Sequence, residues 1–207
     1  MSPVNKRAEK AKQTRLRMLR AAGELFVERG YGATPLQDIA DRAGVAVQTI
    51  YFTFRNKRNL LKEVVDTAIA GDDEPVATMD RQWFRDALAE ETAQAHLRAH
   101  IAGTRQVLER VAAIVEVLRV AAATDPEVVD LWPKGEDPRY TVQAATAKSL
   151  VTKPGTRAEL SADHAADVLF GLLSPELYLL LVRDRGWTPD QWEQWAYDTL
   201  RAQLVSC

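Results

Sequence analysis

The chain has 207 residues, of which 46% are hydrophobic and 27% charged, with a formal net charge of −2. This composition is that of an ordinary globular protein with one large or two small domains, and it excludes disordered, collagen-like and disulfide-stapled chains. The lone cysteine, Cys207, rules out a disulfide within the chain and agrees with a reducing compartment. The longest apolar run is interrupted at Ser174, Pro175 and Glu176, short of a membrane span. We expect a soluble, cytoplasmic protein that makes no membrane contact.

The two ends of the chain differ in charge. Residues 1–60 carry 12 Lys and Arg against 5 Asp and Glu, whereas residues 61–207 carry 15 against 24. A basic head on an acidic body indicates a polyanion partner for the head alone, unless the basic side chains are merely solvated.

Apolar residues at helical spacing predict helices along nearly the whole chain. In chain order the expected helices cover residues 10–28, 35–42, 47–54, 56–71, 83–89, 92–124 (as one helix or two), 161–185 with a kink or restart at the proline, and 188–204. Residues 72–80 are acidic and form the expected linker, and residues 126–152 are interrupted by prolines. The predicted class is therefore all-α.

Polar residues that precede a proline mark several helix starts, because the polar oxygen satisfies first-turn amides and proline has no amide to satisfy. Thr34 and Thr188 also have a glutamine three positions later, which predicts two capping boxes. The positions with this polar-proline pattern are Thr34, Asp125, Asp137, Ser174 and Thr188.

Two short predicted helices, 35–42 and 47–54, are joined by the four residues Ala43-Gly44-Val45-Ala46. This is the spacing of a helix-turn-helix, whose turn needs a small residue and whose angle Ile39, Ala40 and Ile50 would fix. The second helix would then be a recognition helix that fits the DNA major groove.

The surrounding pattern is more specific than the helix pair. It runs Ala21-Ala22-x-x-Leu25-Phe26-x-x-x-Gly30-Tyr31-x-Ala33-Thr34-x-Leu36-x-x-Ile39-Ala40-x-x-Ala43-Gly44-Val45-x-x-x-Thr49-Ile50-Tyr51-x-x-Phe54-x-x-Lys57-x-x-Leu60. Over residues 12–70 this closely resembles the N-terminal domain of the tetracycline-repressor (TetR) family. The resemblance implies a homodimeric, non-enzymatic regulator, usually a repressor, which a small molecule releases from a near-palindromic operator in double-stranded DNA.

The resemblance also implies which residues meet DNA. By position these are Thr34, Gln37, Val47, Gln48, Thr49, Tyr51, Phe52 and Lys57. The physical roles agree, because glutamine pairs with adenine, threonine bonds either base type and valine touches a thymine methyl. A lysine at a helix start suits phosphate. Two departures are Ala46 at the recognition-helix cap and Phe52 at a position that is often polar; Tyr51 could instead pack in the core.

The basic residues Lys6, Arg7, Lys10 and Lys12 form a tail that could follow the DNA backbone or the minor groove, or simply be solvated.

The body offers an expected effector pocket but no cofactor motif. A few polar groups among large apolar side chains are typical of ligand cavities. The candidates are Phe84, His96, His100, Arg105, Leu118, Trp132, Tyr140, Phe170 and Tyr178. His96 and His100 share a helix face, yet no third ligand at a recognisable spacing indicates a metal. We expect neither cofactor nor metal.

The segment 162–184 is apolar nearly all round, which predicts burial against a second copy in a four-helix bundle about a two-fold axis. The expected interface residues are Leu173, Leu177, Leu180, Trp192, Trp195, Leu200 and Leu204.

Together these features predict a DNA-binding domain at residues 1–72 and a ligand-binding, dimerising domain at residues 73–207. Two other hypotheses stay open at this point. One is an effector-independent DNA-binding or scaffold protein whose body binds a protein partner, and the other is a helical metal enzyme that uses His96 and His100.

Overall fold

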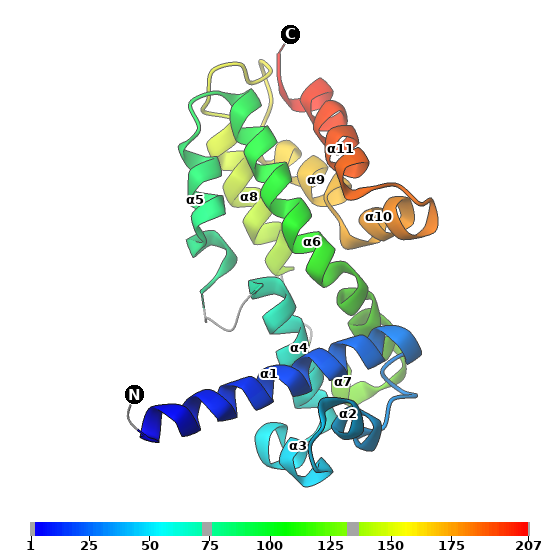
Figure 1. The fold of residues 1–207 in the computed structure, drawn as a ribbon. Helices are drawn as coiled ribbons and strands as arrows, with labels where there is room; N and C mark the ends of the chain where they lie inside the picture. Colours follow the sequence, from blue (N-terminus) through cyan, green and yellow to red (C-terminus); the bar gives the residue numbers. More distant parts are fainter. Residues whose placement is uncertain (1–2, 72–75, 132–136, 207) are drawn as a thin grey trace. The chain divides into compact units, whose positions relative to one another are not determined.

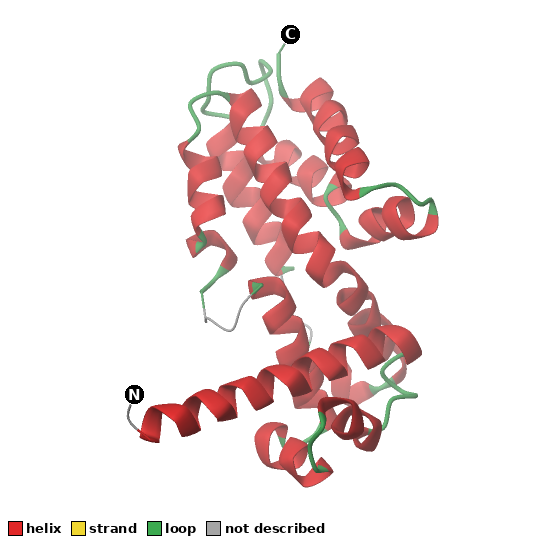
Figure 2. Ribbon diagram, viewed as in Figure 1, coloured by secondary structure: helices red, strands yellow, loops and turns green. Residues whose placement is uncertain are grey.

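The computed structural model describes residues 3–71, 76–131 and 137–206, and in these ranges it is helical without a strand (Figures 1 and 2). The predicted all-α class is confirmed. The elements are α1 (Pro3–Arg29), α2 (Leu36–Ala43), α3 (Val47–Phe54), α4 (Lys57–Ala70), the 3-10 turn η1 (Thr78–Asp80), α5 (Gln82–Ala89), α6 (Ala93–Thr124), α7 (Pro126–Val129), α8 (Pro138–Leu150), α9 (Ala162–Leu172), α10 (Pro175–Leu179), the π-helical turn η2 (Leu180–Asp184) and α11 (Pro189–Leu204).

The chain forms two compact units. The first contains Met1–Ala68 and Ala113–Trp132, and the second contains Ile69–Ala112 and Pro133–Cys207. Helix α6 is continuous over 32 residues and contributes to both units. The predicted boundary after residue 72 falls outside the described residues, as does much of the predicted linker, so both stay predictions.

Helices α1 to α4 of the first unit bury side chains that recur every three or four residues, as helix periodicity requires. The core contains Met18, Leu19, Ala22, Leu25, Phe26, Ile39, Ala40, Ile50, Phe54, Leu60 and Leu61. Helix α1 begins at Pro3 rather than near Lys10. Residues 6–13 of this helix are exposed and show no apolar stripe, although Lys, Arg, Ala and Glu all favour helix.

The predicted caps hold with one exception. Asp125, Asp137, Ser174 and Thr188 each accept a bond from a first-turn amide, and Thr188 with Gln191 forms the predicted capping box. Ser161 caps α9 in the same way. The box predicted at Thr34 is wrong, because the N-cap of α2 is Pro35 and no side chain caps that helix.

The second unit has its own core, formed by α6, α8, α9, α10 and α11 (Figure 1). Leu97, Ile101, Leu169, Trp192 and Leu200 are among its fully buried members. Ser174 ends the run of α9 and caps α10, so the predicted restart at Pro175 is confirmed.

One segment, Ala162–Asp184, is long and apolar enough to cross a membrane when only length and hydropathy are considered. Its mean hydropathy is 1.7. Its longest regular helix, α9, has only 11 residues, whereas a span needs about 20. Part of the segment is buried in the core of the second unit, as is usual for a core helix of a globular protein.

Candidate functional site

Helices α2 and α3 form the predicted helix-turn-helix. Gly44 ends α2 in the left-handed conformation (φ 67°, ψ 44°), which a side chain at this position would disfavour. The amide of Val45 donates to the carbonyl of Ala40 over 3.0 Å and closes the turn. Ile39, Ala40 and Ile50 are fully buried, so they fix the angle between the two helices as the sequence predicted.

The side chains on the outer face of α3 are exposed or half-buried. Gln48 is exposed, Val47 and Thr49 are half-buried, and Ala46 caps the helix without a side-chain bond. The first-turn amides of α3 therefore have no side-chain acceptor, which is the arrangement that receives a phosphate at a helix N-terminus.

Two aromatic residues of α3 face solvent. The exposed fraction is 52% for Tyr51 and 92% for Phe52, whereas Phe54 is buried at 2%. Phe54 is thus a core residue, and Tyr51 is not. An almost fully exposed phenylalanine on the outer face of a recognition helix is available to touch a thymine methyl or a sugar.

Thr34 does not lie on the surface that was expected to contact DNA. It is fully buried, and its hydroxyl donates to the carbonyls of Gly30 and Leu25 over 2.8 and 3.2 Å. A hydroxyl held in this way does not reach a phosphate, so the predicted DNA contact of Thr34 is corrected to a bond that fixes the loop between α1 and α2. Gln37 is exposed and donates to Asp41 over 2.8 Å.

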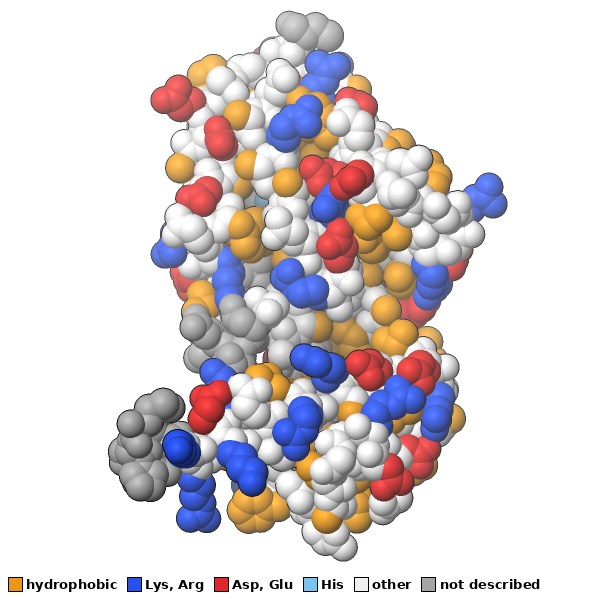
Figure 3. All heavy atoms as spheres, viewed as in Figure 1, with side chains coloured by type: hydrophobic (Ala, Val, Ile, Leu, Met, Phe, Trp, Pro, Cys, Tyr) orange, Lys and Arg blue, Asp and Glu red, His pale blue; other side chains and the backbone are white. Residues whose placement is uncertain are grey.

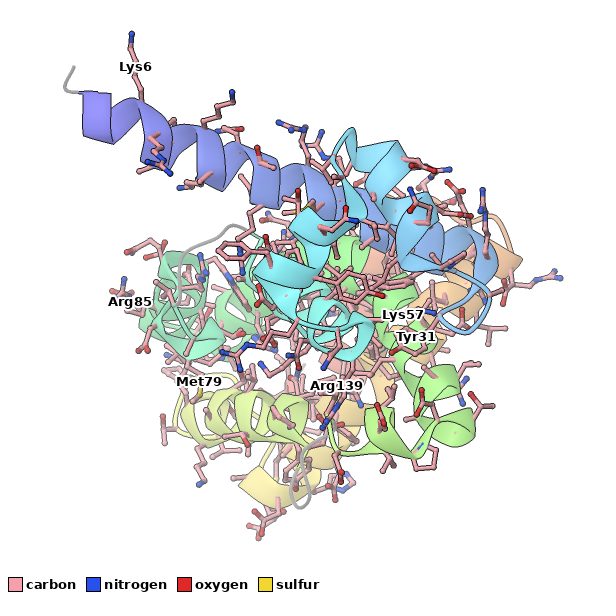
Figure 4. All side chains as sticks on the ribbon, turned by 90° about the horizontal axis from the view of Figure 1, so that it is seen from below. Lys6, Tyr31, Lys57, Met79, Arg85 and Arg139 are labelled. Carbon is pink, nitrogen blue, oxygen red and sulfur yellow. The ribbon has the colours of Figure 1, made fainter. Side chains whose placement is uncertain are left out.

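Lys57 begins α4, as predicted, and its ammonium lies 4.4 Å from the centre of the Tyr31 ring (Figure 4). Burial lowers the pKa of Lys57, while Asp125 acts in the opposite sense. Burial of Tyr31 raises the pKa of its hydroxyl, and the nearby Asp125 and Glu127 raise it further. Lys57 is thus held in place by a cation–π contact, and the residue as a whole is half-buried.

The basic side chains at the start of the chain project from a helix. Lys6, Arg7, Lys10 and Lys12 lie on α1 and are exposed, and Lys6 marks its far end in Figure 4. Lysine and arginine side chains also gather along the α1 side of the first unit in the space-filling view (Figure 3). This surface suits a phosphate backbone, and its contact with DNA stays a prediction.

The second unit holds two buried histidines one helical turn apart on α6. His100 is bonded at both ring nitrogens, with Nε2 2.9 Å from Oε1 of Gln143 and Nδ1 3.3 Å from the hydroxyl of Thr146. His96 is also fully buried, but neither of its ring nitrogens has a hydrogen-bond partner. Burial lowers the pKa of each histidine to about 4, so both are neutral at pH 7.

Two aromatic rings lie against His100. The ring centres of Trp83 and Phe84 lie 6.2 and 6.1 Å from that of His100. Trp83 lies against Gly103 so closely that a Cβ atom there would come within 2.0 Å of the indole. A glycine inside α6 is therefore what admits the indole to this position.

Comparison with known proteins identifies the first unit. Residues 18–64 match the model of the bacterial regulatory proteins of the tetR family. The chain is 39% identical over 64 residues to the HTH-type transcriptional regulator TtgR of Pseudomonas putida, which is 31% of this chain and 30% of TtgR. The matched sequence thus spans about a third of that relative's length.

Two solved structures share the fold over nearly the whole chain. One is a transcriptional regulator of Saccharomonospora viridis solved with choline, at a TM-score of 0.69 and 21% identity, over 95% of this chain and 100% of that one. The other is NalD of Pseudomonas aeruginosa, a secondary repressor of a multidrug efflux pump, at a TM-score of 0.62 and 19% identity, over 94% and 98%. The match to the TetR family thus covers residues 18–64, and over the rest of the chain the likeness is one of fold. The names of these relatives are those of transcription regulators, not of enzymes.

The predicted effector-pocket residues do not all belong to the second unit. Trp132 lies outside the described residues, and Leu118 belongs to the first unit, whereas the others belong to the second. Arg105 is held by Glu109, Glu193 and Asp190, so it is corrected from a free ligand-orienting cation to a surface ion pair.

Three of the four predicted aromatic pocket residues of the second unit pack among themselves and their neighbours. Tyr140 donates to Asp167 over 3.1 Å and stacks edge-on with Phe170, while Tyr178 packs edge-on against Trp192. Phe84 is buried, and its ring packs edge-on against that of His100.

The predicted dimer residues of the second unit fall into two groups. Leu173, Trp192, Leu200 and Leu204 are buried in the core of one chain, so their predicted contact with a second copy is corrected. The sequence predicted them as dimer contacts because the apolar pattern of a helix does not show whether its own chain or a second copy buries it. Leu177, Leu180 and Trp195 retain exposed surface, with Leu180 at 49%.

One residue next to the recognition helix was not predicted. Arg55 ends α3 with φ 69° and ψ −48°, a conformation that costs a non-glycine residue about 1–3 kcal/mol. Its side chain is exposed on the turn that leads to Lys57. A positive φ leaves no mark in the sequence, so only a basic residue in a turn could have drawn attention to it.

Proposed function

We propose that this protein binds operator DNA through α2 and α3 and that a small molecule bound in its second unit controls this binding. Repression relieved by the small molecule is the form we expect. We place this function in the cytoplasm, with a second copy of the chain as partner.

The observation that supports DNA binding most directly is the outer face of α3. Gln48, Tyr51 and Phe52 face solvent on a helix whose inner face is fixed by Ile50 and Phe54. A rigid helix with an amide side chain and an exposed ring on one face has the chemistry that reads base edges in a major groove.

Helix α6 supports control by a ligand. His96 and His100 lie on its part within the second unit, and the part from Ala113 to Thr124 belongs to the first. A ligand that prefers one position of a continuous helix biases both units, and a typical coupling of about 1–3 kcal/mol changes DNA affinity 5- to 150-fold.

The test of the function is an electrophoretic shift on DNA that flanks the protein's own gene, with and without a compound library. We expect a specific complex on a near-palindromic site that at least one compound dissolves. A complex that no compound alters, although some raise the melting temperature, would support the effector-independent alternative.

Two substitutions distinguish base contacts from phosphate contacts. Gln48→Ala should cost about 1–3 kcal/mol on the operator and little on scrambled DNA, because it removes a base-edge contact. Lys57→Ala should weaken both DNAs alike and reduce the salt dependence by about one unit per head. Gln194→Ala is the matched control, because this exposed glutamine lies on α11.

The metal-enzyme hypothesis finds no support. Within the described ranges no group of three or more His, Cys, Asp or Glu side chains is placed to hold a metal ion. His100 is committed to Gln143 and Thr146.

A further inference from the structure

His96 is the one side chain in the described part of the buried histidine cluster that lacks a partner. Its exposed fraction is zero, and both ring nitrogens are without a hydrogen bond. His100, one turn along the same helix, is bonded at both nitrogens. An unpaired buried polar group costs about 1–3 kcal/mol, so the contrast between the two histidines calls for a partner that His96 acquires.

The charges around His96 restrict what that partner can be. The nearby cation, Lys153, donates its ammonium to the carbonyls of Leu88 and Glu90 over 2.9 and 2.5 Å. The neighbouring His100 is neutral, because burial lowers its pKa to about 4. A cationic ligand group would be repelled by Lys153, and an anionic group would have to be desolvated among buried side chains, a cost that an ion pair with Lys153 often fails to offset.

A neutral imidazole offers one donor and one acceptor. A hydroxyl or an amide complements both, whereas a hydrocarbon complements neither. Ala93 and Leu97 flank His96 on α6 and are fully buried, and the rings of Phe84 and Trp83 line the neighbouring His100. These surroundings favour an apolar, aromatic body on the ligand.

We propose that His96 anchors an uncharged effector that has an aromatic or apolar body and a hydroxyl or amide group within hydrogen-bonding reach of the imidazole. The inference rests on the proposed control by a small molecule, and it specifies the chemical class of that molecule. It assigns His100 a different role, since Gln143 and Thr146 fix that ring in the wall of the site.

The test uses four probes that share one ring: benzyl alcohol, toluene, benzoate and benzylamine. We expect benzyl alcohol to bind the full-length protein about 3- to 10-fold more tightly than toluene, the gain of one neutral hydrogen bond. Benzoate and benzylamine should bind more weakly than either. Affinities come from the rise in melting temperature as each probe is titrated.

The variant His96→Leu should bind benzyl alcohol and toluene equally and should unfold no more easily than the parent, because it removes an unpaired polar group. His164→Leu is the matched control, since His164 is exposed in the first turn of α9. It should keep the parent's preference for the alcohol.

A measurement on the parent protein makes the test independent of any variant. The chain has only three histidines, so ¹⁵N spectra of labelled histidine rings resolve His96. Benzyl alcohol should shift its nitrogen signals, and toluene should leave them nearly unchanged. Equal affinity for the alcohol and the hydrocarbon, binding of a charged probe at least as tight, or unmoved His96 signals would each overturn the proposal.

Failure of this inference and failure of the proposed function give different results. If His96 ignores the probes while another compound releases the operator, control by a small molecule stands and the anchor is wrong. If the alcohol binds at His96 but no compound of the library changes DNA affinity, the anchor stands and the control is wrong.

Discussion

Because Gly103 lies against Trp83, we expect Gly103→Ala to lower the stability of the protein, although helix propensity alone predicts a gain. In the interior of an exposed helix, Gly→Ala stabilises by about 1 kcal/mol. At Gly103 the new Cβ atom would come within 2.0 Å of indole Cε3 and 2.6 Å of Cζ3, where carbon atoms need about 3.5–4.0 Å. The indole must move, and overpacking of this kind costs about 1–3 kcal/mol. We expect Gly103→Ala to destabilise the protein by up to about 2 kcal/mol once the gain in propensity of about 1 kcal/mol is subtracted.

A double-mutant cycle isolates the cause. In a Trp83→Ala background the obstacle is gone, so Gly103→Ala should stabilise by about 1 kcal/mol. Gly171 is the matched control, because it also lies in a helix and a Cβ there would meet nothing within 4 Å. Gly171→Ala should stabilise by about 0.5–1 kcal/mol.

The assay is urea unfolding of the four combinations, followed by circular dichroism at 222 nm. Equal stabilisation by Gly103→Ala and Gly171→Ala would refute the reasoning, because it would mean that the indole does not occupy the space above Gly103. A destabilisation that persists without Trp83 would place the obstacle elsewhere.

Three further predictions concern stability and assembly. Thr34→Val keeps the volume but loses the hydroxyl proton that the carbonyls of Gly30 and Leu25 share, so it should cost about 1–2 kcal/mol in urea unfolding and leave DNA affinity unchanged; a loss of affinity in the folded variant would restore Thr34 as a DNA contact. His96 and His100 have a pKa near 4 when folded and 6.5 when unfolded, so the unfolded chain binds more protons as the pH falls from 6.5 towards 4 and stability decreases over that range. The loss should be about 2 kcal/mol per histidine between pH 7 and pH 5, and a stability that is flat with pH would contradict the neutral pair. Leu180→Glu should weaken the dimer in sedimentation and hardly change unfolding of the single chain, because that side chain is about half exposed; an undiminished dimer would move the interface away from Leu180.

The DNA-binding unit could be predicted from sequence because its signals are local. Gly44 fixes the turn by its backbone freedom, and Ile39 and Ile50 mark the inner faces by spacing alone. The wrong prediction at Thr34 shows that a local sequence pattern does not reveal which hydrogen-bond partner a side chain takes in the folded protein. A threonine three residues before a glutamine fits a capping box, but the carbonyls of Leu25 and Gly30 compete for the same hydroxyl.

The second unit was predicted less well because its contacts are remote in sequence. The apolar positions of α9 and α11 were correct, yet periodicity does not say whether Trp192 and Leu200 pack on their own chain or on a second copy. Arg105 looked like a free cation because its partners Asp190 and Glu193 lie more than 80 positions away. The unpaired state of His96 depends on three-dimensional neighbours and was not predictable.

The exposed ring of Phe52 has a consequence for how the proposed DNA complex would respond to ionic strength. Binding through lysine and arginine weakens steeply as salt rises, because each phosphate contact gives up its gain from released counterions. Apolar area removed from water contributes about 25 cal/mol per Å² and does not depend on counterions. If the almost fully exposed Phe52 contacts DNA, that part of the binding free energy should not decrease as the salt concentration in the cell rises. The operator should remain occupied under osmotic stress that strips proteins bound by phosphate contacts alone.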